Sequence, residues 1–347
     1  MEFYQCKHEF VCGVDLHSKM MYICIMNRKQ EILVHKPIKN KNLVEFKKAL
    51  EPYRGKILVV SEACFPYYWL YDFLAKIKVD FQLGHPFYMG LIHKGKVKND
   101  KLDSKKIAKL TLNDSLPPAH ACSKGIRSLR DLARRRSSFV QDRSALMTHI
   151  KIQGYQSNID DIGKITKVKI RENKIAPIFK DEDLRVNVEL NLNTIDFLNE
   201  KIDNLEKYIV SRMNQLFFKN FTLLKSIKGI GDIIAQTILL EIDDINRFPN
   251  HKGFASYCRV VKCSHDSAGK KLGYGNSKIG NPYLRNAFGE AAVKMAQHNS
   301  SIKKFFNKLE IKHGTGKAYA ILSHKISRSI YHMLKKGVEF DIKLFLK

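Results

Sequence analysis

The stretch FVCGVDLHSKM, residues 10–20, decides the fold of the first part of the chain. Residues 10–16 form a short apolar run, which is typical of a buried strand and carries the acidic residue Asp15 next to its end. A second apolar run, MYICIM at residues 21–26, follows almost at once and predicts a second strand. The chain therefore begins with a strand pair that carries a carboxylate at one end.

Working outward from this pair, the sequence alternates strands and helices up to about residue 124. Glu31 to Val34 reads as a third strand, and the helical spacing of residues 43–50 leads to the apolar strand ILVV at residues 57–60. A helix over residues 67–77 and a strand over residues 80–83 complete the pattern. This alternation predicts an α/β domain with a mixed sheet over residues 1–124.

The character of the chain changes after residue 124. Residues 125–150 are basic and helical, residues 157–180 are polar and read as a loop or a domain-swapped excursion, and residues 192–218 read as a long helix. The long helix carries apolar residues at heptad spacing: Ile195, Leu198, Ile202, Leu205, Ile209 and Leu216. An intramolecular hairpin with residues 125–150, an intermolecular coiled coil and a mixture of both all fit. We expect a helical or coiled-coil region at 125–220 and a mostly α-helical domain at 221–347.

Charge is the strongest compositional feature. The chain has 61 Lys and Arg against 34 Asp and Glu, a formal net charge of +27, and its hydrophobic content of 44% fits a folded protein. Such an excess attracts a polyanion, and nucleic acid is the commonest one. The seven cysteines are scattered and form no CxxC pair, which disfavours a zinc site and a disulfide framework and favours a reducing cytoplasm. No apolar segment approaches the roughly 18 residues of a membrane span, and no secretory signal is expected.

Four carboxylates stand at positions that suit a metal centre. Asp15 ends the first strand, Glu62 follows the fourth, and Asp100 and Asp103 lie three residues apart where a helix begins. An i, i+3 pair faces one side of a helix, so both acids can address one cation. Together they predict an oxygen-ligand cage for Mg²⁺ or Mn²⁺. The competing interpretation is that they are turn, surface and helix-dipole acids without chemistry.

Two later segments suit contacts with phosphate. Gly229 and Gly231 precede an apolar helix, and a Gly-x-Gly turn there resembles half of a helix-hairpin-helix that grips the DNA backbone. The alternative is a tight helix connection. The Ser-rich and Gly-rich stretch at residues 263–280 suits a loop held against phosphate. Candidate bases for neutralising phosphate charge in and beside it are Lys270, Lys271, Lys278 and Arg285.

The segments at residues 13–19 (GVDLHSK), 61–63 (SEA) and 99–103 (NDKLD) resemble the RuvC-like (RNase H-like) DEDD domain of the Piv/MooV family, the transposases of the insertion sequence one-ten type. Asn99 and Ser104 depart from the family's usual Thr and Ala beside the acid pair. The resemblance extends over nearly the whole chain. It implies a nucleophilic serine in a D-S-G-like motif that forms a covalent phosphoserine link with DNA. Ser267 is our match, with Ser264 and Ser277 as alternatives.

The resemblance implies a transposase or site-specific DNA recombinase of a mobile element. Its expected partners are element-end and target DNA, a structured noncoding guide RNA, and further copies of itself in a dimer or tetramer. We expect it in the bacterial cytoplasm at the nucleoid. Two other functions stay open: a RuvC-like nuclease or Holliday-junction resolvase, which needs the four acids but no serine, and a non-enzymatic nucleic-acid-binding protein.

Overall fold

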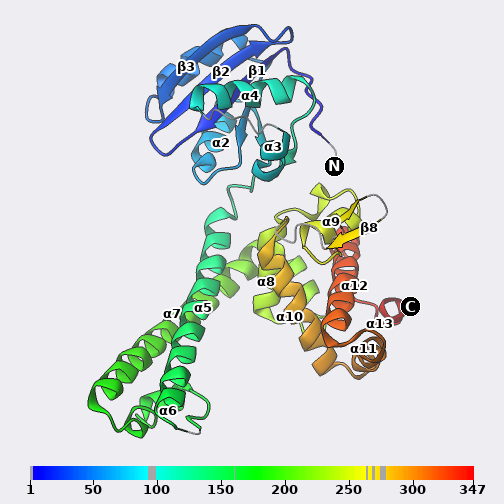
Figure 1. Ribbon diagram of the computed structural model, residues 1–347. Helices are drawn as coiled ribbons and strands as arrows, with labels where there is room; N and C mark the ends of the chain where they lie inside the picture. The colour runs from blue at the N-terminus through cyan, green and yellow to red at the C-terminus, as the bar shows by residue number, and fades with distance from the viewer. Residues whose placement is uncertain (1–2, 93–98, 160, 263–264, 268–269, 274–278) are drawn as a thin grey trace. The chain divides into compact units, whose positions relative to one another are not determined.

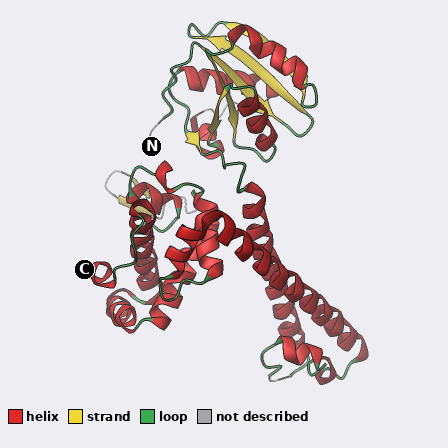
Figure 2. Cartoon of the chain, turned by 180° about the vertical axis from the view of Figure 1, so that it is seen from behind, coloured by secondary structure: helices red, strands yellow, loops and turns green. Residues whose placement is uncertain are grey.

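A computed structural model describes residues 3–92, 99–159, 161–262, 265–267, 270–273 and 279–347. The chain forms two compact units, residues 1–124 and residues 125–347. The first unit combines a sheet with helices, and the second unit is mostly helical (Figures 1 and 2). The prediction of a mixed α/β N-terminal part followed by a mostly helical part is confirmed.

The first unit is built on one six-stranded sheet with the strand order β3-β2-β1-β4-β5-β6. The pairs β1–β4 and β4–β5 are parallel, whereas β1–β2, β2–β3 and β5–β6 are antiparallel, so the sheet is mixed as expected. The strands are β1 (Phe10–Leu16), β2 (Met20–Asn27), β3 (Ile32–Lys39), β4 (Ile57–Glu62), β5 (Asp80–Gly84) and β6 (Pro118–Ala119).

β3 is longer than the sequence indicates. The sequence pattern ends the third strand at Val34, but β3 continues to Lys39 and includes Pro37. Proline lacks a backbone N–H and is tolerated in a sheet at an edge strand. β3 is the edge of this sheet, so the polar, proline-containing half of the strand still pairs with β2.

The two faces of the sheet bury different helices. Even-numbered residues of β1, such as Cys12 and Val14, pack with α1 (Leu43–Leu50), the short helix η1 (Glu51–Tyr53) and α2 (Tyr67–Lys76). Val11 of β1 and Leu58 and Val60 of β4 pack instead with α4 (Asp100–Leu112), beside α3 (Pro86–Ile92). Figure 1 shows α4 lying across β1 and β2. Because successive strand residues alternate between faces, Gly13, Asp15 and Glu62 belong to the α4 side.

The second unit contains a long helical hairpin. α5 (Arg127–Gln156) and α7 (Glu182–Lys225) run side by side in both views, so the intramolecular hairpin is present in the chain (Figures 1 and 2). Ile195, Ile202 and Ile209 of the predicted heptads are buried. Leu216 is 45% exposed, and it precedes Phe217, where the backbone of α7 leaves helical geometry (φ −133°, ψ 23°).

The segment between these helices is more ordered than expected. It contains α6 (Lys167–Arg171) and the short helix η2 (Ala176–Ile178), and it packs on its own chain at the far end of the hairpin (Figure 1). Ile162, Ile175 and Phe179 are buried there together with Ile150 and Leu192 of the long helices. Isolated apolar residues in a polar stretch carry little periodicity, which is why the sequence does not predict this small core.

The remaining elements of the second unit follow α7. They are α8 (Asp232–Ile242), η3 (Ile245–Arg247), α9 (His251–Tyr257), β7 (His265–Ser267), β8 (Lys270–Gly273), α10 (Pro282–His298), α11 (Ser300–His313), α12 (Thr315–Lys336) and α13 (Ile342–Leu346). β7 and β8 form an antiparallel pair within the stretch for which the sequence predicts a serine-rich loop. Among the described helices, none combines the length and apolar composition that crossing a membrane requires.

Candidate metal centre

A glycine brings the start of α4 against the end of β1. A Cβ atom added to Gly13 would overlap the Ser104 carbonyl oxygen and lie 2.6 Å from the Ala108 nitrogen. Contact this close is available only to a residue without a side chain. The backbone of α4 therefore rests directly on β1, and the first turn of the helix lies beside Asp15, two residues further along the same face.

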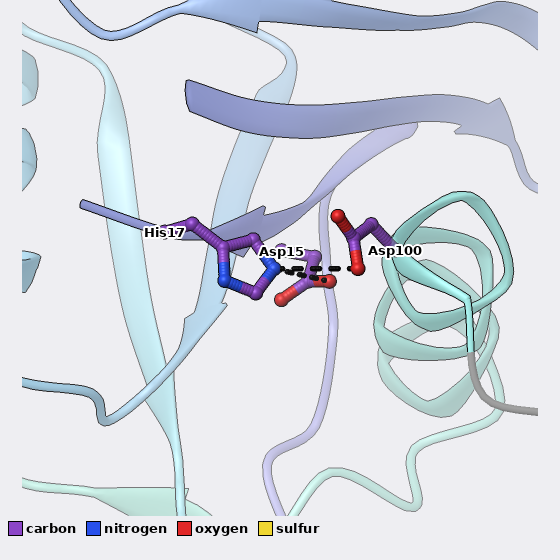
Figure 3. A group of neighbouring side chains, drawn as sticks. All are labelled: Asp15, His17 and Asp100. Carbon is purple, nitrogen blue, oxygen red and sulfur yellow. Dashed lines mark hydrogen bonds and ion pairs between the residues drawn. The ribbon is translucent and has the colours of Figure 1, made fainter. Parts of the chain in front are cut away.

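Two of the four predicted carboxylates converge here, together with one histidine. Asp15, His17 and Asp100 each offer a ligand atom, and these atoms all lie within 4.8 Å of one another. The Nε2 atom of His17 is 3.3 Å from Oδ2 of Asp15 and 3.4 Å from Oδ1 of Asp100. Figure 3 shows the imidazole approaching both carboxylates, one at the end of β1 and one at the start of α4.

The electrostatics of this cluster centre on Asp15, whose side chain is only 18% exposed. Burial raises the pKa of Asp15, because a carboxylate loses hydration there. His17 opposes this change in pKa, whereas the negative charges of Asp100 and Asp103 add to it. Negative charges that raise the proton affinity of Asp15 also favour a cation beside it, since a bound cation relieves the repulsion.

Asp103 lies beside the cluster rather than inside it. Its carboxylate pairs with Lys106 at 2.8 Å, and its charge still acts on Asp15. Both acids of α4 stand in the first turn, where the helix dipole favours negative charge. The capping role itself belongs to Asn99, whose side chain accepts a hydrogen bond from the Lys101 backbone nitrogen at 2.9 Å. The two acids are therefore not needed as caps.

Glu62 is the last residue of β4 and is exposed. Val14 pairs with Ser61 in the parallel β1–β4 ladder, so Asp15 and Glu62 stand one step further, at neighbouring strand ends. Both acids act on the nearby Cys64 thiol. Burial raises the pKa of this thiol to about 11, and the charges of Glu62 and Asp15 contribute to the increase. Glu62 is not part of the three-residue group with mutually close ligand atoms.

His17 is the member that our sequence analysis did not assign. The available signal was its position two residues after Asp15, because residues i and i+2 of an extended chain share a face. The backbone at His17 stays extended enough for the side chains of Asp15 and His17 to share a face. The His17 nitrogen donates a hydrogen bond to the Met20 carbonyl oxygen at 3.0 Å, across the turn into β2.

The predicted glycine turn before α8 has a structural explanation. Gly229 has φ +107°, and a Cβ atom on it would lie 2.7 Å from the backbone nitrogen of Met295 in α10. Close packing of helices therefore explains why a glycine is present at position 229. This agrees with the alternative interpretation of the segment as a tight connection between helices. Gly231 is the N-cap of α8, and no side chain caps the helix there. Phosphate binding by Gly229 and Gly231 stays a prediction.

The predicted serine segment is described only in part. Ser267 is the last residue of β7 and pairs with Lys270 of β8, while its side chain and that of Lys271 lie outside the described part. Ser264, Ser277 and Lys278 lie outside the described residues altogether. Two of the predicted phosphate-neutralising bases are described with their side chains, and both are exposed: Lys270 and Arg285.

The exit of this segment is firmly anchored. The backbone nitrogen of Asn281 bonds to the Tyr257 carbonyl oxygen at 2.7 Å, which closes the segment onto the end of α9. Gly280, at φ +99°, packs against the same carbonyl oxygen and against Arg259. The pKa of Arg259 is lowered by burial and by the positive charge of Arg285. The ends of the serine segment therefore meet beside the positively charged side chains of Arg259 and Arg285.

Comparison with known proteins gives consistent matches along the chain. A family model for DEDD transposases of the IS110 type, described as "Transposase", matches residues 12–153, and a model described as "Transposase IS116/IS110/IS902 family" matches residues 221–307. The chain is 23% identical over 341 residues to the transposase for insertion sequence element IS1111A of Coxiella burnetii, covering 94% of this chain and 90% of that protein. It is 19% identical over 337 residues to the transposase for insertion sequence element IS1328 of Yersinia enterocolitica, covering 95% and 98%.

Proposed function

Since this chain is a transposase of the IS110/IS116 family, with its DEDD domain and its C-terminal transposase domain, we propose that it cuts and rejoins DNA by metal-dependent strand exchange through a covalent phosphoserine intermediate. The single observation that carries the metal-dependent part is the convergence of Asp15, His17 and Asp100. The serine part is carried by the family resemblance and by the anchored segment that contains Ser267.

The donor set fits a divalent cation. Asp15 and Asp100 would hold Mg²⁺ or Mn²⁺ directly, and we propose that Asp103, in the first turn of α4, and Glu62, at the neighbouring strand end, complete a four-carboxylate set. Carboxylate oxygens are the ligands that Mg²⁺ prefers. When bound, the cation supplies charge stabilisation at the oxygens of the reacting phosphodiester.

His17 has a role that follows from its position. Its imidazole approaches two carboxylates, with a hydrogen bond to Asp15 and a distance of 3.4 Å from its Nε2 atom to Oδ1 of Asp100. Without His17, the partly buried Asp15 faces only negative neighbours, and its carboxyl group takes up a proton more readily. His17 therefore opposes protonation of Asp15, and a metal ligand needs the deprotonated carboxylate.

The covalent step belongs to a serine of the segment between α9 and α10. The hydroxyl oxygen of Ser267 forms a bond to phosphorus while the bond from phosphorus to a sugar oxygen breaks, and the displaced sugar oxygen leaves as a hydroxyl group. Rejoining reverses the two bond changes with a different sugar hydroxyl. Lys270, Lys271, Lys278 and Arg285 are the proposed bases that neutralise phosphate charge during this exchange.

Partner selection is the remaining part of the proposal. We propose that a structured noncoding RNA pairs with both DNA partners, and that the chain acts as a dimer or tetramer. The net charge of +27 supports binding of more than one nucleic acid. In the basic stretch Arg134-Arg135-Arg136 of α5, Arg134 and Arg136 pair with Glu241 and Glu206.

The experiment that tests the proposal compares two variants in a strand-exchange assay with element-end and target DNA. Asp15→Ala is expected to abolish recombination, and Ser267→Ala is expected to abolish the covalent protein–DNA adduct. Ser264→Ala and Ser277→Ala are matched controls that should retain the adduct. A covalent adduct formed by Ser267→Ala would contradict the assignment of Ser267 as the nucleophile. Normal recombination by Asp15→Ala would contradict the proposed role of the metal centre.

The same assay separates the alternative function. A RuvC-like nuclease or junction resolvase would need the carboxylates but no serine. Cleavage of branched DNA that is lost with Asp15→Ala but unaffected by removal of all three serines would identify that activity instead.

A further inference from the structure

One side of α12 carries a row of basic side chains that none of the roles above uses. His324, Arg328, His332 and Lys336 follow one another at four-residue steps, which places them along one side of the helix. The core side of α12 is formed by other residues, among them Leu322, Ile326 and Ile330. The basic row is therefore separate from the packing face.

A second element adds a histidine to this row. His251 begins α9, and its ring centroid is 5.5 Å from that of His332. The position of α9 on α12 is fixed by buried aromatic packing, since Phe254 of α9 lies 5.9 Å from the Tyr331 ring and the Tyr331 hydroxyl donates to the Phe248 carbonyl oxygen at 3.2 Å. The packing of α9 on α12 therefore holds His251 against the row.

Positive charge on this surface is not balanced by acids. Within the described residues, none of the ion pairs involves His251, His324, Arg328 or His332. The groups that act on the two α12 histidines are all bases: His251 from α9, and Arg328 and Lys336 from α12. Burial lowers the pKa of His324 and His332, and these neighbouring bases lower it further. Bases held together without an acid favour a multiply charged anion as ligand.

We propose that the surface formed by His251, His324, Arg328, His332 and Lys336, here called the α9–α12 basic row, binds the sugar–phosphate backbone of duplex DNA. The row runs for about 18 Å along the helix at 1.5 Å per residue. Successive phosphates of one strand advance about 3.4 Å along the duplex axis, so the row can contact several of them. The ligand is DNA because transposases act on DNA and because bases spread over about 18 Å of one helix suit a polyanion.

Binding at this row is coupled to proton uptake. The lowered pKa values of His324 and His332 favour the neutral form of these side chains in the free protein, whereas a phosphate beside them favours the imidazolium form. The affinity for duplex DNA therefore rises as the pH is lowered from 8 to 6. The inference rests on the proposed function only in taking DNA as the partner, and it requires neither the metal centre nor the serine.

The test uses the full chain and a mixed-sequence DNA duplex, with binding followed by fluorescence anisotropy. The variant His324→Gln, Arg328→Gln, His332→Gln is compared with the control Lys303→Gln, Lys304→Gln, Lys308→Gln, which removes three exposed charges from α11. We expect the α12 variant to bind on the order of tenfold more weakly at 0.1 M salt, with a shallower dependence on salt concentration. We expect the control to lose less, although it removes more charge.

Three results would overturn the inference: unchanged DNA affinity in the α12 variant, a loss no larger than that of the α11 control, or an affinity independent of pH in the unsubstituted chain. A loss confined to structured RNA would assign the row to RNA and also overturn it. Arg328→Gln alone keeps the test valid if the triple variant does not fold. Duplex binding is measured separately from strand exchange, so failure of the metal centre and failure of the basic row are distinguishable.

Discussion

Arg134 on α5 donates two hydrogen bonds to Glu241 on α8, from Nε to Oε1 at 2.6 Å and from Nη2 to Oε2 at 2.7 Å. The Glu241 side chain is 3% exposed, and its Oε2 atom also accepts a hydrogen bond from Asn281 Nδ2 at 2.7 Å. Asn281 in turn caps α10 through the backbone nitrogens of Tyr283 and Leu284. One buried carboxylate therefore joins α5, α8 and α10 and fixes the exit of the serine segment.

Replacing Glu241 by Ala is expected to lower the free energy of unfolding by about 3 kcal/mol, because it leaves a partly buried guanidinium and an amide without their shared acceptor. The matched control is Glu206→Ala. Glu206 pairs with Arg136, also on α5, but its side chain is 31% exposed, and we expect a loss below about 1 kcal/mol. Urea denaturation measures both variants, and equal losses would contradict the special role of Glu241.

Gly13→Ala is expected to lower the free energy of unfolding by about 1–3 kcal/mol, because the added methyl group overlaps the backbone of α4. Displacement of α4 from β1 should also weaken Mg²⁺ binding, since Asp100 moves with the helix. Gly90→Ala in α3 is the control, because nothing lies within 4 Å of its added Cβ. Thermal melting and isothermal calorimetry with MgCl₂ test both effects. A stable Gly13→Ala protein with unchanged Mg²⁺ affinity would show that this close approach does not set the site.

Alkylation of Cys64 is expected to be slow at pH 8 and to speed up as the pH approaches 11, since its thiol pKa is about 11. A cation held by Asp15 and Asp100 would offset the negative charges that raise this pKa, so MgCl₂ should accelerate the reaction at fixed pH. Peptide mapping after iodoacetamide treatment follows Cys64 separately from the other cysteines. Asp15→Ala should remove the Mg²⁺ effect, and a Mg²⁺ effect that persists in this variant would contradict binding at Asp15.

The free energy of unfolding is expected to fall as the pH is lowered below about 6.5, the ordinary pKa of a histidine side chain. In the folded chain the pKa values of His324 and His332 are lowered, so the unfolded chain binds more protons in this range. The contribution to stability is fully present above the ordinary histidine pKa and is lost as the pH falls towards the lowered values of the folded chain. Urea midpoints between pH 7.5 and 5 measure the effect. The double variant His324→Gln, His332→Gln should show a smaller decrease, and an identical decrease would disprove the assignment.

Much of the first unit could be predicted from local pattern. Strand residues alternate between faces with a period of two, and the apolar runs of β1 and β4 are short and unbroken, so their ends and the acids Asp15 and Glu62 were identifiable. The i, i+3 spacing of Asp100 and Asp103 likewise follows from helix geometry alone. Polar stretches without periodicity, such as the second half of β3 and the core around Phe179, escaped prediction because pairing with β2 and packing against α5 and α7 stabilise them, and the local pattern does not show these contacts.

The sequence by itself therefore determined the type of the main strands and helices of the first unit, the basic character of the chain and the acids available for a metal centre. Only the tertiary structure decided which of these residues meet. It brought His17 between Asp15 and Asp100, left Glu62 at the neighbouring strand end, and joined Arg134 to Glu241 across 107 residues. The physical reason is that local propensity depends on a few neighbouring residues, whereas side-chain convergence depends on strand order and on close backbone contacts such as that of Gly13 with α4.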